Sequence, residues 1–290
     1  MVLFETSLIL GITLGLVYAL AGVGLVVIYR TSGYVSFCQG DIAAVSLYIG
    51  LACYKAGLPY PIMALVVVAS GAVLAGVIGG FIVVPLERFG TLSAALATIG
   101  VGLAIQGIEN LTVDATPQAF PSAGAQTAFT IGPVHLAVSD ITSAVVSAAL
   151  FVALGLFFRI SRIGIAMRAA NDNPAAAVHV GLSGKKLKHL SWILAGGLSG
   201  ACGLFVAPIY SLTPVSVNAL LVFGFATVVL GGFESVMGAL VAGIIIGVTS
   251  NMLAAYLNTN LVTFGIYALL LVVLLVRPSG LLGRRTLVRV

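Results

Sequence analysis

The chain has 290 residues, of which 60% are hydrophobic and 7% are charged, and its net charge at pH 7 is +5. Its mean hydropathy of +1.20 lies far above that of soluble globular domains and excludes that class. Several uncharged stretches reach the roughly 20 apolar residues that a helix needs to cross a bilayer. The composition therefore predicts an all-α, polytopic membrane protein, with residues 1–290 forming one transmembrane domain.

Hydropathy and helix breakers divide the chain into about nine membrane elements. We expect these elements at residues 7–29, 41–54, 61–84, 91–110, 141–158, 190–210, 219–231, 238–256 and 261–276. Glu5 is the only charge before the first apolar run, which therefore lacks the basic start of a signal peptide. We expect this run to be retained as a membrane helix.

Two elements, 41–54 and 219–231, are too short to cross a bilayer comfortably and are flanked by glycine. They lie in different halves of the chain, and each follows a full-length helix. Short, glycine-interrupted segments at corresponding positions are typical of a midplane pathway built from an inverted repeat. A pair of merely short or tilted helices is the alternative.

Glycines four residues apart recur along the chain, in GITLG (11–15), GVIGG (76–80), GGLSG (196–200) and GIIIG (243–247). On a helix this spacing makes a flat strip where a second backbone can approach closely. The pattern predicts close helix packing and requires no catalytic role.

The Lys and Arg residues indicate the orientation, because such residues concentrate in cytoplasmic loops. With the N-terminus outside and the C-terminus inside, every Lys and Arg except Lys55 lies on the cytoplasmic side. Loop 111–140, which has neither residue, is then extracytoplasmic. Because the basic residues lie at membrane edges, the net positive charge gives no indication of nucleic acid as a partner.

Polar groups inside a membrane are costly and are therefore functional candidates. We select Thr13 and Tyr18 in the first element, Asp41 at the head of the second, and Gln106, Glu109 and Asn110 at the end of the fourth. As alternatives, Glu109 lies in water at the outer face, and Asp41 caps its own helix.

A cytoplasmic loop at 159–189 gathers much of the charge of the chain and contains its own helix signals. Asn173 can cap a helix, Pro174 suits its first turn, and Gly181 can end it. We expect a short helix that exposes Ala175, Ala176, Ala177, Val178 and Val180 among basic residues. Docking to a partner protein is the preferred interpretation, and contact with anionic lipid is the alternative.

The sequence resembles the inner-membrane permease subunits of ATP-binding-cassette importers for branched-chain amino acids, specifically the shorter of their two permease types. The resemblance covers nearly the whole chain. It rests on GITLGLVYALAGVGLVVIYR (11–30), VSFCQGD (35–41), LATIGVGLAIQ (96–106), GIAMRAANDNPAAAVHVGL (164–182), LGGFESVMGALVAGIIIG (230–247) and RPSGLLG (277–283), in this order.

The resemblance implies a bacterial inner-membrane assembly of two homologous permeases, two cytoplasmic ATPase subunits and an extracytoplasmic solute-binding protein. ATP and Mg would bind to the ATPase subunits, and this chain would carry no cofactor, metal or catalytic residue. The family's ATPase-coupling segment maps onto Arg168, Asn171, Asp172, Asn173, Pro174, Ala175, Ala176, Ala177, Val178, His179 and Gly181.

The chain departs from its relatives at the start of the short second element. Ser36 and Cys38 stand where relatives usually carry Asn and Ala, and Gln39 stands where many carry His. We add Ser36 and Gln39 to the pathway candidates. Branched-chain or other amino acids are the expected solutes, with urea, amides and small aromatic carboxylates as alternatives within the family.

Two other classes make different predictions. An ion-coupled secondary transporter or channel requires ion-binding carboxylates in mid-helix, whereas nearly all acids here lie near helix ends. An intramembrane enzyme requires catalytic or metal-ligand sets inside helices. His135, His179 and His189 fall in loops or at edges, and Cys38, Cys53 and Cys202 have no metal or disulfide spacing.

Overall fold

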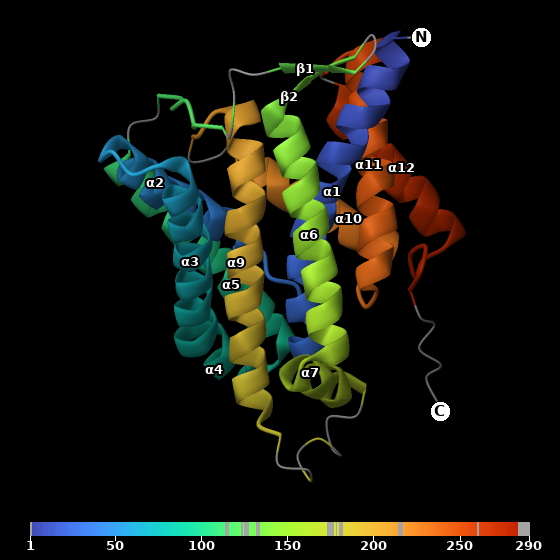
Figure 1. Ribbon diagram of the computed structural model, residues 1–290. Coiled ribbons are helices and arrows are strands. Elements are labelled where there is room, and N and C mark those ends of the chain that lie inside the picture. Colours follow the sequence, from blue (N-terminus) through green and yellow to red (C-terminus); the bar gives the residue numbers. More distant parts are fainter. Residues whose placement is uncertain are drawn as a thin grey trace.

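The computed structural model describes residues 2–113, 116–122, 124, 128–131, 134–172, 177, 179, 182–213, 217–259 and 261–283. In this part of the chain, six helices are long and apolar enough to cross a membrane. They form a bundle, with a β-hairpin at one end and the short helix α7 at the other (Figure 1).

The helices are α1 (Val2–Ser32), α2 (Gln39–Lys55), α3 (Tyr60–Val77), α4 (Val84–Leu86), α5 (Thr91–Thr112), α6 (Val138–Ile160), α7 (Arg162–Asp172), α9 (Gly184–Tyr210), α10 (Asn218–Gly231), α11 (Val236–Tyr256) and α12 (Leu261–Val276). A π-helical segment, η1 (Ile78–Val83), and a 3₁₀ turn, η2 (Glu87–Phe89), continue α3, so that Tyr60–Phe89 forms one rod. Each predicted membrane element is confirmed as a helix.

Helix α1 lies at the centre of the bundle and packs mainly against α11. At their crossing, a Cβ atom added to Gly15 would lie 2.7 Å from Cα of Ile244 and 2.8 Å from the carbonyl oxygen of Gly243. Such a distance leaves no room for any side chain. The predicted close packing of GITLG and GIIIG is confirmed, and each segment is the partner of the other.

The second tight crossing joins α3 to α9. A Cβ atom at Gly71 would lie 2.5 Å from the carbonyl oxygen of Gly196, and one at Gly200 would lie 2.8 Å from that of Val67. The ring of Trp192, which is fully buried, covers Gly79 in the π-helical segment. The glycines of GVIGG and GGLSG therefore hold α3 and its continuation against α9.

The two short helices, α2 and α10, contact each other inside the bundle. Each follows a long helix, and the described residues between the two helices are non-helical, residues 33–38 before α2 and residues 211–213 and 217 before α10. Gly232, with φ of 101°, ends α10 in a backbone conformation that favours glycine. With 17 and 14 residues, α2 and α10 are confirmed as short helices, but α12, with 16 residues, is equally short, and the repeat that would relate α2 to α10 stays a prediction.

One end of the bundle carries the antiparallel hairpin β1 (Ala128–Ile131) and β2 (Val134–Ala137), which the sequence did not predict. Backbone hydrogen bonds of 3.0 and 2.8 Å join Gln118 to Leu212 at this end. Lys55 donates from Nζ to Oε1 of Gln118 at 2.6 Å. The segment between α5 and α6 is thus tied to the ends of α2 and α9.

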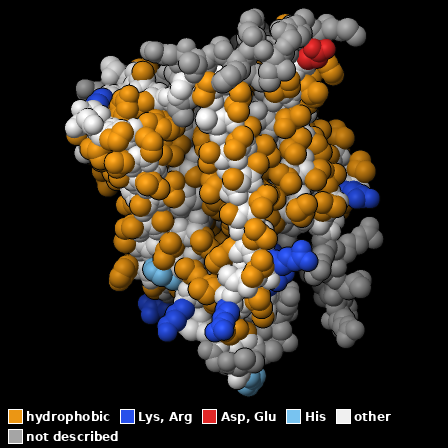
Figure 2. All heavy atoms as spheres, viewed as in Figure 1, with side chains coloured by type: hydrophobic (Ala, Val, Ile, Leu, Met, Phe, Trp, Pro, Cys, Tyr) orange, Lys and Arg blue, Asp and Glu red, His pale blue; other side chains and the backbone are white. Residues whose placement is uncertain are grey.

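Hydrophobic side chains cover the side of the bundle along its length, and most visible Lys and Arg side chains gather toward the α7 end (Figure 2). Leu65, Val73, Leu103 and Leu275 are among the large apolar residues that remain more than half exposed. A belt of exposed apolar side chains is what a lipid-facing surface requires. The structure therefore confirms a multi-span membrane protein.

Candidate translocation site and coupling surface

The chain bends back into the bundle just before α2, and polar contacts hold this bend. The backbone N–H of Phe37 donates to Oγ1 of Thr98 on α5 at 3.1 Å. Ser36 is fully buried, with its hydroxyl 3.5 Å from Sγ of Cys38. Gln39 is also buried and accepts at Oε1 a 2.6 Å hydrogen bond from Ser199 on α9. The predicted residues Ser36 and Gln39 therefore fix the start of α2.

Asp41 lies in the first turn of α2 and faces α5. Its Oδ1 accepts a 2.8 Å hydrogen bond from Nε2 of Gln106. A Cβ atom at Gly102, one turn before Gln106, would lie 2.5 Å from Oδ2 of Asp41. Because Gly102 has no side chain, the carboxylate of Asp41 can lie directly against α5. The structure thus brings together two residues that the sequence placed 65 positions apart.

Glu109 lies on the same face of α5, three residues beyond Gln106. Its side chain is 4% exposed, which excludes the alternative that it lies in water at the outer face. Neither carboxylate oxygen has a hydrogen-bond partner in the described part of the chain, and neither has the buried hydroxyl of Tyr48. Burying a charged carboxylate without a hydrogen-bond partner is costly, and more so within a membrane. Glu109 is therefore an expensive feature that packing alone does not explain.

The remaining pathway candidates are Thr13 and Tyr18 on α1 and Asn110 on α5. Thr13 lines a cavity of about 280 Å³ between α1, α6 and α9, which Asp140 and Asn251 also line. Tyr18 is buried and stacks on Phe223, with ring centroids 4.7 Å apart. Asn110 is exposed near the end of α5.

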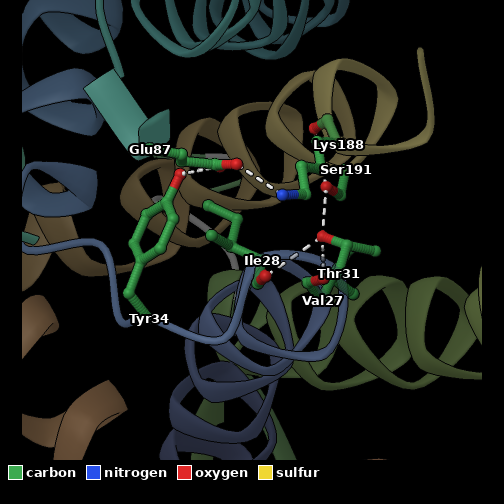
Figure 3. Close-up of polar contacts among 7 residues, drawn as sticks. All are labelled: Val27, Ile28, Thr31, Tyr34, Glu87, Lys188 and Ser191. Atoms are coloured by element: carbon green, nitrogen blue, oxygen red, sulfur yellow. Dashed lines mark hydrogen bonds and ion pairs between the residues drawn. The ribbon is translucent and has the colours of Figure 1, made fainter. Parts of the chain in front are cut away.

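The α7 end of the bundle holds a polar cluster that the sequence analysis did not predict (Figure 3). Glu87 in η2 forms an ion pair with Lys188 in the first turns of α9. The hydroxyl of Tyr34 donates to Oε1 of Glu87 at 2.9 Å. Burial, and next the charge of Glu87, raise the pKa of this hydroxyl above its ordinary value, so that it stays a neutral donor. The hydroxyls of Thr31 on α1 and Ser191 on α9 lie 2.7 Å apart.

This cluster joins three elements that are distant in the sequence. Glu87 ends the rod that begins as α3, Lys188 begins α9, and Tyr34 leads from α1 toward α2. The pairing of Glu87 with Lys188, 101 residues away, has no local sequence signal. Only the acidic residue next to a predicted helix end could have suggested it.

The predicted coupling segment is only partly described. Asn173, Pro174, Ala175, Ala176, Val178, Val180 and Gly181 lie outside the described residues. Ala177 and His179 have helical geometry, and the N–H of Leu182 donates to the carbonyl of Ala177 at 3.0 Å. A bond that spans five residues is typical of a helix C-terminus, as predicted here.

One expectation for this segment is wrong. Ala177 is 7% exposed and lines a cavity of about 490 Å³ with Arg30, Ala170 and Lys188, so it packs toward its own chain. His179 is exposed. The sequence pattern, which is apolar at nearly every position of this segment, did not indicate that Ala177 turns inward.

The loop also contains a longer helix that was not predicted from the sequence. Helix α7 carries Arg168, Asn171 and Asp172 of the predicted coupling set. It buries Met167 and leaves Ile163 and Ile165 nearly half exposed. Its mixed charged and apolar composition, with a four-residue spacing between Ile163 and Met167, was the available signal.

Residues 7–275 match the family described as branched-chain amino acid transport system, permease component. The chain belongs to this permease family. The permease is 28% identical to the high-affinity branched-chain amino acid transport system permease protein LivH of Escherichia coli K12, with 94% of each chain covered. It is 26% identical to BraD of Pseudomonas aeruginosa, named as a permease protein of the same kind of system, with 96% of this chain and 95% of BraD covered.

A further relative is LivM of Escherichia coli, another permease protein of a high-affinity branched-chain amino acid system. The permease is 26% identical to LivM and covers 68% of its length. Among solved structures, the permease is similar in fold to a chain of PsaBC from Streptococcus pneumoniae in complex with Fab. The TM-score is 0.53 with 13% identity, covering 96% of the permease and 93% of that chain.

Proposed function

We propose that the permease is a membrane-spanning subunit of an ATP-driven importer for branched-chain amino acids. Its proposed partners are a second homologous permease, two cytoplasmic ATPase subunits and an extracytoplasmic solute-binding protein. The names of LivH and BraD support the solute class and the transport role. The similarity to both LivH and LivM, two permease proteins from one organism, supports a homologous permease as the partner.

We place the α7 end of the bundle in the cytoplasm, in the bacterial inner membrane, with the N-terminus outside. The gathering of Lys and Arg toward that end carries this proposal, because such residues are retained on the cytoplasmic side (Figure 2). Helix α7 and the exposed His179 would then meet the ATPase subunits, which hold ATP and Mg. The exposed Ile163 and Ile165 supply apolar contact area on the same surface.

The polar cluster at the α7 end gives a physical route for coupling. Lys188 follows the proposed docking segment directly and is tied to the rod that begins as α3 through Glu87. Tyr34, bonded to the same carboxylate, leads into the bend that carries Ser36, Gln39 and Asp41. A displacement of this end by the ATPases would therefore reach the polar residues inside the bundle.

Uptake into right-side-out vesicles tests this function, because an importer moves its solute from the outer face inward. Vesicles with the permease, its partner permease and the binding protein should accumulate radiolabelled leucine only when ATPase subunits and ATP are also present. Leucine uptake by the permease alone, driven by an ion gradient, would instead support a secondary transporter. ATP-dependent uptake of urea, an amide or an aromatic carboxylate in place of leucine would change the solute class and keep the importer.

The coupling surface has its own test. His179→Glu should reduce copurification of the ATPase subunits with the permease, because the side chain is exposed and the substitution puts an acid on the proposed docking surface. Full copurification and full uptake in this variant would contradict docking at His179. Ala177→Glu cannot serve here, because burial of Ala177 against its own chain would disturb the fold itself.

A further inference from the structure

Asp41 on α2 and Glu109 on α5 are two buried acids on facing helices. Helices α2 and α5 run in the same direction, since Phe37 contacts Thr98 and Asp41 contacts Gln106 further along both helices. The side chains of Asp41 and Glu109 are 3% and 4% exposed. Gln106, which bonds Asp41, lies three residues before Glu109 on the same face of α5, so both acids flank this one glutamine.

The polar atoms of this pair are only partly used. Asp41 accepts one hydrogen bond, from Gln106, at Oδ1. Both oxygens of Glu109 and the hydroxyl of Tyr48 are buried with no partner in the described residues. The ion pair found among the described residues joins Glu87 to Lys188 and includes neither Asp41 nor Glu109. Two neighbouring carboxylates that lack a counter-charge favour a cation or a proton between them.

We propose that Asp41 and Glu109, with the hydroxyl of Tyr48, bind the ammonium group of an amino acid as it passes through the permease. An ammonium group carries three N–H donors and no acceptor. Both Glu109 oxygens and the tyrosine oxygen offer acceptors to it, and Asp41, on the other side of Gln106, adds a second negative charge. The inference rests on the proposed function and names the part of the solute that this face of α2 and α5 recognises.

Access to the site requires α5 to move relative to α2, and α5 is suited to do so. Of its 22 residues only Ala94, Thr98, Gly102 and Glu109 are buried. Outside its N-terminal end its main contact is with α2. The polar contacts of Gln106 and Thr98 are among the bonds that hold it. A lightly packed helix held by polar contacts can separate from its neighbour at low cost.

Amide substitutions distinguish an ammonium site from a pair of acids that share a proton. Gln and Asn resemble protonated Glu and Asp in shape but cannot carry the negative charge that binds an ammonium group. Glu109→Gln and Asp41→Asn should each lower ATP-driven leucine uptake by the complete importer at least ten-fold, with unchanged assembly. Glu5→Gln, at an exposed acid on α1, is the matched control and should transport normally. Normal uptake in both amide variants would overturn the site and leave a proton-sharing, structural role.

A binding measurement on the purified permease keeps this test independent of the ATPases. Isopentylammonium chloride, which carries the leucine side chain and only the cation, should raise the unfolding midpoint in detergent by several degrees. Sodium 4-methylpentanoate, which carries only the anion, should not. The shift should vanish in Glu109→Gln and Asp41→Asn.

This measurement distinguishes failure of the ammonium site from failure of the proposed importer. An absent shift, or an equal shift in the amide variants, would overturn the ammonium site even if the wild-type complex imports leucine. A shift that depends on both carboxylates in a permease that never assembles with ATPases would support the site and refute the importer.

Discussion

Gln106 on α5 donates a 2.8 Å hydrogen bond from Nε2 to Oδ1 of Asp41, in the first turn of the short helix α2. The bond can form because Gly102, which has no side chain, lets the Asp41 carboxylate approach α5 closely. It connects the lightly packed α5 to the centre of the bundle. Hydrogen bonds to charged groups contribute about 1.5–3 kcal/mol, so this contact should add measurably to the stability of the permease.

Removing the donor should loosen α5 and leave Asp41 unpaired. Gln106→Leu is expected to lower the free energy of unfolding by about 1–3 kcal/mol, because a buried acceptor loses its partner. Thermal unfolding in detergent measures this change. In the Asp41→Ala background the same substitution should cost much less, and an equal cost in both backgrounds would show that the bond is not the cause.

The glycine crossing between α1 and α11 should be intolerant of even one methyl group. Gly15→Ala puts a Cβ atom 2.7 Å from Cα of Ile244, and overpacking of this kind typically costs about 1–3 kcal/mol. Gly155→Ala on α6 is the matched control, since its Cβ would meet nothing within 4 Å. It should be neutral or stabilising by up to about 1 kcal/mol, as Ala favours helices over Gly. Equal unfolding midpoints for the two variants would refute the tight crossing.

Charge reversal in the polar cluster should distinguish the contribution of the ion pair from that of the neighbouring hydrogen bonds. Lys188→Glu places two acids together and is expected to lower both the unfolding midpoint and leucine uptake. The exchange Glu87→Lys with Lys188→Glu should recover part of both, because an attractive pair is restored. No recovery in the exchanged variant would mean that the hydrogen bond from Tyr34, and not the ion pair, holds the cluster.

The positions of the membrane helices could be predicted because length and hydropathy depend on residues close together in the chain. Asp41 and Glu109 could be selected for the same reason, since a charge within an apolar run is a local signal. That Asp41 contacts Gln106, or that Gly15 faces Gly243, depends on which helices are neighbours. Hydropathy carries no information on neighbours, because all faces of these helices are apolar.

The cytoplasmic end was harder to predict for a different reason. In α7 the apolar positions are few and lie between charged residues, so a search for membrane helices passes over it. For Ala177 the error lay in the choice of face. A run of alanine and valine has no polar side to indicate which residues turn inward.

The apolar residues on α7 should contribute to ATPase docking. Ile165 is 46% exposed, and Ile165→Glu would replace an apolar contact with a charge. ATPase copurification should therefore fall at least several-fold. Leu257→Glu provides the control at the opposite end, where Leu257 is 66% exposed. If Ile165→Glu copurifies at the wild-type level, α7 faces anionic lipid instead of the ATPase subunits.

Cross-linking at position 179 tests the proposed coupling surface most directly. Cys38 and Cys202 are buried, so only Cys53 needs replacement by Ser before His179→Cys is introduced. A short thiol-reactive cross-linker applied to membrane vesicles that hold the assembled complex should join position 179 to an ATPase subunit. The account predicts this product only in vesicles whose cytoplasmic face is accessible. No product in an assembled complex, or labelling of position 179 by an impermeant reagent from the outer face, would contradict it.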